Sequence, residues 1–117
     1  MQIHLSPRNL RLTAAIHQHT ATKILHLEDL ADDIIAAHVV IMNDDGAKPD
    51  KQFTVKAHLA LPGSDLHAAK SGEDLYLVLD EVADRLARQL RKRRTAFVDK
   101  RREKARRAKE QRKRPGA

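Results

Sequence analysis

Residues 71–94 read SGEDLYLVLDEVADRLARQLRKRR, a stretch that begins acidic and apolar and ends as a run of cations. Ser71, followed three residues later by Asp74, fits the capping signature of a helix N-terminus. Apolar side chains then recur at the spacing of one helical face, as in a helix that lies on a core: Leu75, Val78, Leu79, Val82, Leu86 and Leu90. Arg93 is next on that face, so we expect the helix to leave the packed domain near there.

Cations border the apolar face of this helix. Arg85, Arg88 and Lys92, at i, i+3 and i+7, line one flank of it. The net charge of +7 is unevenly distributed, because most Lys and Arg residues lie between Arg85 and Arg114. Segregated positive charge indicates a polyanionic partner, with nucleic acid first and an anionic membrane second. The alternative is a solvated basic tail that only aids solubility.

The composition restricts the class of protein. A chain of 117 residues predicts a single domain with one modest core. The absence of cysteine excludes disulfides, thiol catalysis and thiolate metal sites, and suits a reducing compartment. No apolar run approaches the roughly 20 residues that span a bilayer, and the N-terminus MQIHLSPRN has no signal-peptide core. We therefore expect a soluble, cytoplasmic, unprocessed protein. No membrane partner is expected either, because the apolar stripe past Leu90 consists only of Phe97 and Val98, too little to insert.

Outward from the last helix, the sequence predicts one further helix and four strands. Thr13 is a suitable N-cap for the first helix. The pair Ser6-Pro7 is expected to end the first strand, and a polar segment with Gly and Pro, 44–50, is expected to form a hairpin loop. The predicted elements are a strand Met1–Ser6, a helix from Ala14 to about Ala31, and strands Ile34–Asn43, Phe53–Leu61 and Leu66–Lys70.

This order, β-α-β-β-β-α, predicts an α+β fold with a four-stranded mixed sheet and two helices on one of its faces. The first two strands are expected to be parallel, joined by a right-handed crossover, and the later ones to form an antiparallel meander. The layout is similar to that of a double-stranded-RNA-binding domain. We expect a domain over residues 1–94 and a basic tail over residues 95–117. The tail has nothing to bury, so we expect a frayed helix or disorder.

Seven histidines raise the possibility of a metal site. His4, His58 and His67 are expected to share the open face of the sheet, one per strand. Nothing in the sequence fixes their spacing or supplies a second shell, so we expect solvated histidines and no metal or cofactor.

Catalytic signatures are equally absent from the sequence. It has no Gly-rich phosphate loop, no Gly-x-Ser-x-Gly and no cysteine nucleophile, and its acidic pairs stand at element ends. We expect no enzyme and no small-molecule substrate.

The cations of the two helices are the candidate RNA-binding residues. His19, Lys23 and His26 line up on one face of the first helix, and the second helix carries the flank described above. Aromatic and amide side chains that read bases are scarce, which favours recognition of RNA shape and backbone. The candidate residues are Lys23, His26, Arg85, Arg88, Arg91, Lys92, Arg93 and Arg94.

The last helix also carries a specific pattern, Asp74-x-Tyr76-x-x-x-Asp80 followed by Arg85-Leu86-x-Arg88-Gln89-Leu90-x-Lys92. Together with Met1-Gln2-Ile3, Thr13-x-Ala15-Ile16 and Leu27-Glu28, it resembles the family of ribosome hibernation-promoting factors and ribosome-associated inhibitors, once called sigma-54 modulation proteins. The resemblance covers roughly residues 1–94 and corresponds to the short form of the family. His26 departs from it, because relatives often carry Lys there.

The resemblance implies a translation inhibitor without enzymatic activity. It would bind the small ribosomal subunit in the channel for messenger and transfer RNA near the decoding centre, and promote ribosome hibernation in stationary phase or stress. It implies ribosomal RNA contacts for Lys23, Arg85, Arg88 and Lys92. Expected partners are the small subunit, its ribosomal RNA and the whole ribosome, with a monomer off the ribosome. The alternative is a general RNA- or DNA-binding protein of the nucleoid type without a specific ribosomal site.

Overall fold

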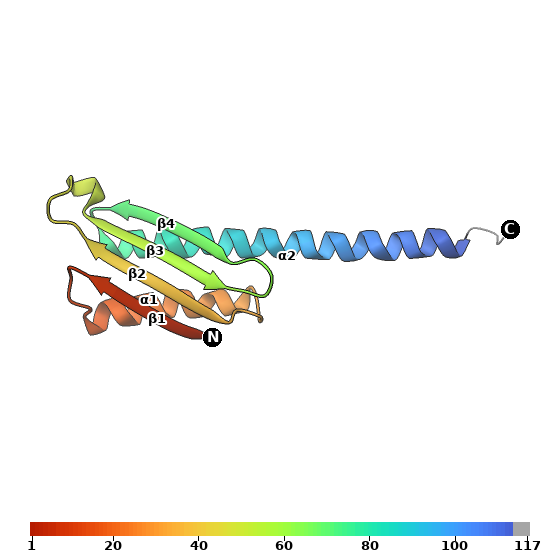
Figure 1. The fold of residues 1–117 in the computed structure, drawn as a ribbon, viewed down its shortest axis with the longest axis horizontal. Helices are drawn as coiled ribbons and strands as arrows, with labels where there is room; N and C mark the ends of the chain where they lie inside the picture. Colours follow the sequence, from red (N-terminus) through yellow and green to blue (C-terminus); the bar gives the residue numbers. More distant parts are fainter. Residues whose placement is uncertain (114–117) are drawn as a thin grey trace.

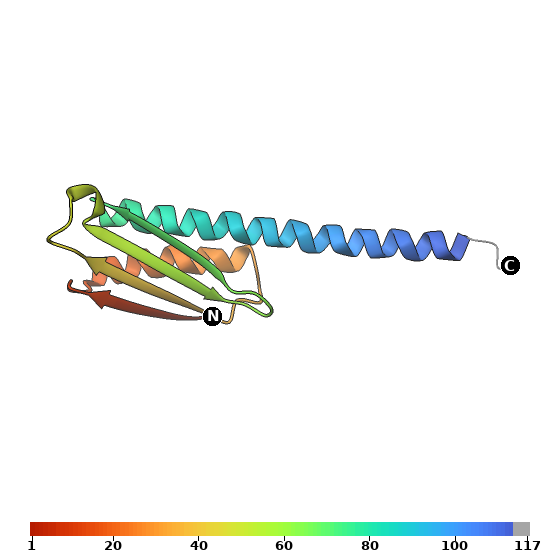
Figure 2. The same ribbon diagram turned by 45° about the horizontal axis from the view of Figure 1, so that its top comes forward.

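The computed structural model describes the backbone of residues 1–113 and the side chains of residues 1–96 and 101–106. One sheet of four strands lies on one side, and both long helices lie on the other (Figure 1). The turned view in Figure 2 shows the helices side by side and running in the same direction. The elements are β1 (Gln2–Arg8), α1 (Ala14–Leu25), η1 (His26–Asp29), β2 (Ala36–Asn43), η2 (Pro49–Lys51), β3 (Phe53–Ala60), β4 (Leu66–Gly72) and α2 (Leu75–Lys113).

The sheet has the order β1-β2-β3-β4. β1 is parallel to β2, while β2, β3 and β4 pair antiparallel in sequence. α1 lies in the connection between the two parallel strands, and α2 follows β4, the last of the antiparallel strands (Figure 1). The predicted α+β fold with a mixed sheet and two helices is confirmed.

The core lies between the sheet and the two helices. Alternate residues of the central strands face it, as the sequence predicted for β3: Val39, Ile41, Val55, Ala57 and Leu59 are buried. From the other side Ile24 and Leu27 pack against them together with the predicted apolar face of α2, from Leu75 to Leu90. The opposite face of the sheet carries no helix, so its side chains border solvent.

β1 is longer than predicted. The strand continues through Pro7 to Arg8, and Pro7 pairs in register with Ile41 of β2. The prediction that Ser6-Pro7 ends the strand was wrong because β1 lies at the edge of the sheet, where one side of the strand has no neighbour and a residue without N–H is tolerated.

The first helix is shorter than predicted. The Thr13 cap is present, with the Ile16 N–H donating to Thr13 Oγ1 at 3.2 Å. The α-helix ends at Leu25, however, and residues His26–Asp29 form a 3₁₀ turn where the sequence predicted helix to about Ala31. Such a tighter last turn is common at helix C-termini. β2 then starts at Ala36, two residues later than predicted.

The start of α2 also differs from the prediction. β4 continues to Gly72, and the Ser71 hydroxyl bonds to Thr54 at 2.8 Å rather than capping the helix. Asp74 is the cap, since its Oδ1 accepts from the N–H groups of Tyr76 and Leu77 at 3.0 and 3.4 Å. Gly72 allows the strand to meet the helix closely, because a Cβ at this position would lie 2.8 Å from Val78 Cγ2.

α2 leaves the domain where its apolar face ends. Leu90 is buried, the positions around Arg93 are half-buried or exposed, and the helix continues to Lys113 well past the sheet (Figure 1). The helix is thus longer than the stretch that the sequence analysis assigned to the domain. The division at residue 94 stays a prediction, and residues 114–117 of the tail lie outside the described residues.

Candidate nucleic-acid interface

The predicted cations lie on the two helices, away from the open face of the sheet. Lys23 is in the last turn of α1, and His26 follows at its end. The remaining candidates lie between Arg85 and Arg94 on α2. α1 and α2 run in the same direction, so the end of α1 and the part of α2 from Arg85 onward lie toward the same end of the domain (Figure 2). The partial negative charge of a helix C-terminus favours Lys23, in the last turn of α1.

Arg85 fastens α2 to the edge of the sheet. Its Nη1 donates to the backbone oxygen of Ala69 in β4 at 2.9 Å, and Gln89 Nε2 donates to the oxygen of His67 at 2.9 Å one turn later. Both acceptors belong to the edge strand. Arg85 is exposed and therefore contributes charge, but it also has a structural bond that the sequence did not indicate.

Arg88 and Lys92 form the free part of the predicted flank. Both side chains are exposed, as are Arg91 and Arg94. Within the part of the chain whose side chains are described, none of these four has a hydrogen bond or an ion pair with another side chain. These four cations are therefore available to an anionic partner.

Arg93 is occupied by an ion pair that the sequence did not reveal. Its Nη2 and Nη1 donate to the two carboxylate oxygens of Asp33 at 2.7 and 3.3 Å. The hydrogen bond from Arg93 lowers the pKa of Asp33 below its usual value, and the same bond raises the pKa of Arg93. The pair joins the segment before β2 to α2 at the point where the helix leaves the domain. Arg93 stays a predicted RNA contact, but one with an intramolecular partner.

Asp80 links the two helices on the interface side. His19 Nε2 donates to Asp80 Oδ1 at 2.7 Å, and Lys23 Nζ lies 3.5 Å from the same oxygen. The His19 ring meets Tyr76 edge-on, with the centroids 5.0 Å apart. The sequence predicts His19 and Lys23 on one face of the first helix but shows no link between them and α2. In the structure both side chains contact Asp80 of α2.

The charge along the exposed side of α2 changes sign. Its N-terminal half carries Asp80, Glu81 and Asp84, of which Glu81 lies 3.8 Å from Lys70. From Arg85 onward the charged residues of α2 are mostly cations, and the acidic ones are Asp99, Glu103 and Glu110. A phosphate backbone would be repelled by the first half and attracted by the second. The candidate interface is therefore the C-terminal half, from Arg85 onward, with His26 exposed at the end of the neighbouring helix.

Other kinds of site are not formed by the described residues. No three His, Cys, Asp or Glu side chains of this part of the chain already converge on a point that holds a metal ion. No helix within residues 1–113 is both long and apolar enough to cross a bilayer.

Comparison with known proteins places these features in a family. Residues 3–97 match the family model described as Sigma 54 modulation protein / S30EA ribosomal protein. A protein of Escherichia coli K12 named ribosome hibernation promoting factor is 33% identical over 93 residues, which cover 79% of this chain and 92% of that protein. A ribosome hibernation promotion factor of Deinococcus radiodurans is 32% identical over 104 residues, 88% of this chain. This chain spans only 54% of the length of the Deinococcus protein.

Solved structures share the fold. The N-terminal domain of Protein Y from Thermus thermophilus superimposes with a TM-score of 0.68 at 29% identity, covering 79% of this chain and 98% of that domain. A protein from Coxiella burnetii described as a ribosomal subunit interface protein gives a TM-score of 0.71 at 24% identity, covering 81% and 99% of the two chains. At that identity the second likeness shows the fold alone.

Proposed function

Since the chain belongs to the Sigma 54 modulation protein / S30EA ribosomal protein family, we propose that it is a hibernation factor that binds the small ribosomal subunit and inhibits translation. The observation that carries the proposal is a group of exposed cations on α2 that have no side-chain partner among the described residues: Arg88, Arg91, Lys92 and Arg94. They stand on a helix that Arg85 and Gln89 fasten to the sheet, so their spacing is set before any RNA arrives.

The arrangement suits the backbone of a structured RNA. Arginine forks bind phosphate oxygens through two parallel hydrogen bonds, and lysine adds a point charge. Sequence reading would need stacked aromatics or amides. Among the residues of α2 whose side chains the structure describes, Tyr76 and Gln89 already have partners within the domain. The binding mode is therefore recognition of ribosomal RNA shape and phosphates by Arg85, Arg88 and Lys92 of α2, with Lys23 and His26 contributing from α1.

Inhibition in this proposal is steric. Bound near the decoding centre, the domain would occupy the channel that messenger and transfer RNA use. No chemical step is required, which agrees with the family's members being named as hibernation factors. The protein would act in the cytoplasm on small subunits or whole ribosomes, in stationary phase or stress.

A general nucleic-acid binder is the second candidate. The cationic run that continues along α2 past Arg94 favours it, because phosphates of any duplex would be attracted to such a helix.

Competition between targets separates the two functions. The affinity of the full chain would be measured for isolated small subunits and for a random duplex RNA at the same physiological salt, since phosphate binding depends steeply on salt. A ribosomal site predicts that small subunits bind more tightly by about 10³-fold or more, the usual margin of specific over non-specific binding. Affinities within about tenfold of each other would support the general binder instead.

A further inference from the structure

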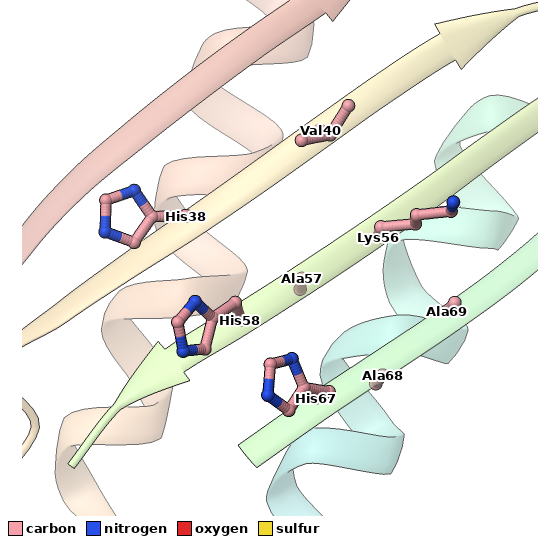
Figure 3. A pocket seen from close by; sticks show the side chains of 8 residues that line it. All are labelled: His38, Val40, Lys56, Ala57, His58, His67, Ala68 and Ala69. Carbon is pink, nitrogen blue, oxygen red and sulfur yellow. The ribbon is translucent and has the colours of Figure 1, made fainter. Parts of the chain in front are cut away.

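Four histidines form one row across the open face of the sheet, on the side away from the helices. The strand register pairs each with the next, and the residues, one from each strand, are His4, His38, His58 and His67. Their ring centroids lie 4.8, 5.8 and 4.5 Å apart in that order, with interplanar angles of 9°, 28° and 10°. Figure 3 shows the last three rings side by side above the sheet. The proposed RNA surface uses none of them.

The sequence alone defines neither the spacing of these histidines nor an outer partner for them. The structure supplies both features. The first is spacing, because the antiparallel register of β3 and β4 places His58 opposite His67. The second is an outer partner. His58 Nε2 donates to Asp65 Oδ2 at 2.7 Å, and Asp65 Oδ1 accepts from the Leu61 N–H at 3.1 Å. A carboxylate on one ring nitrogen is the usual orienting partner of a metal-binding histidine.

The hydrogen bond to Asp65 also fixes which ring nitrogen of His58 is free. A carboxylate oxygen accepts, so the shared proton lies on Nε2 of His58. This arrangement leaves Nδ1 as the nitrogen with a free lone pair.

We propose that His58 and His67 chelate a divalent transition-metal ion such as Zn²⁺ or Ni²⁺, each through one imidazole nitrogen. Zinc binds imidazole nitrogen at about 2.0–2.1 Å, so the two rings, now 4.5 Å apart, must turn toward each other and give up their stacking. The site is thus not preformed, which agrees with the absence of three converged ligands among the described residues. The outer ring, His67, is exposed and His58 is half-buried.

The surroundings leave room for this rearrangement. A hollow of about 430 Å³ adjoins the row and is lined by small or apolar side chains such as Val40 and Ala69 (Figure 3). Lys56 is the one Lys or Arg among the residues that line it. A metal here would tie β3 to β4, the strand to which Gln89 of α2 is bonded through the His67 oxygen.

The test is calorimetric titration of ZnCl₂, and separately of NiCl₂, into the full chain without an affinity tag. We expect one equivalent of metal to bind and to raise the thermal midpoint, because a ligand that binds only the folded state stabilises it. His67→Gln should abolish the stoichiometric binding. Asp65→Asn, which keeps both ligands, should weaken it by about 10- to 100-fold, as losses of such outer partners do.

A matched control separates the row from any exposed imidazole. His17 is exposed on α1, and α1 covers the face of the sheet opposite to the row (Figure 1). His17→Gln should therefore leave the titration unchanged. Absence of binding by the unmodified chain, or equal weakening in His17→Gln and His67→Gln, would overturn the proposal. No RNA is present in this experiment, so its outcome is independent of the proposed ribosomal function.

Discussion

Small ribosomal subunits should lose at least about 100-fold in affinity for the chain when Arg88 and Lys92 are both replaced by Glu, which is about 2.8 kcal/mol at about 1.4 kcal/mol per tenfold. Each substitution removes a cation and places a carboxylate against phosphate. Neither side chain has a partner among the described residues, so the folded domain should be unaffected. Arg85 is left in place because its bond to the Ala69 oxygen fastens α2 to β4.

The matched control reverses the same number of charges elsewhere. Lys48 and Lys51 are exposed in and beside η2, at the end of the sheet opposite to the projecting part of α2 (Figure 1). Lys48→Glu with Lys51→Glu gives the same net charge as the first variant. Equilibrium binding to small subunits should change little for this pair, and the thermal midpoints of both variants should match that of the original chain. An equal loss of affinity in the two pairs would mean that net charge alone governs binding.

Leu86→Ala should reduce the free energy of unfolding by about 2–5 kcal/mol, the usual cost of emptying a buried leucine site. Leu86 is 0% exposed in the core between α2 and the sheet. The loss is a large fraction of a small domain's stability, so the urea midpoint of unfolding should fall clearly.

Leu77→Ala is the control, since Leu77 is 58% exposed on the same helix. It changes the same side chain in the same secondary structure without opening a cavity, and should alter the unfolding free energy by less than about 0.5 kcal/mol. Equal destabilisation by the two substitutions would contradict the assignment of the two faces of α2.

Local patterns in the sequence predicted the parts of the fold that depend on neighbours in the chain. The alternation from Phe53 to Leu61 placed β3 and its buried side correctly, and the helical spacing from Leu75 to Leu90 identified the buried face of α2. The predicted capping by Ser71 was wrong, because Ser71 still belongs to the sheet, and Asp74 caps α2 instead.

Contacts between distant residues could not be predicted in this way. Arg93 and Asp33 lie 60 residues apart, and His19 and Asp80 lie 61 apart, so only the packed fold brings each pair together. The histidine row was predicted only in part. His4, His58 and His67 were expected on the open face, one per strand, but nothing in the sequence indicated their register or the place of His38 between His4 and His58.

The claim that the domain occupies the channel of the small subunit is tested most directly by mutual exclusion. Small subunits saturated with the chain would be mixed with a messenger fragment and initiator transfer RNA, and the bound fraction of each would be measured by sedimentation. The proposal predicts that transfer RNA binding falls as occupancy by the chain rises, and that excess transfer RNA and messenger displace the chain. Simultaneous saturation of the same subunits by the chain, messenger and transfer RNA would contradict it.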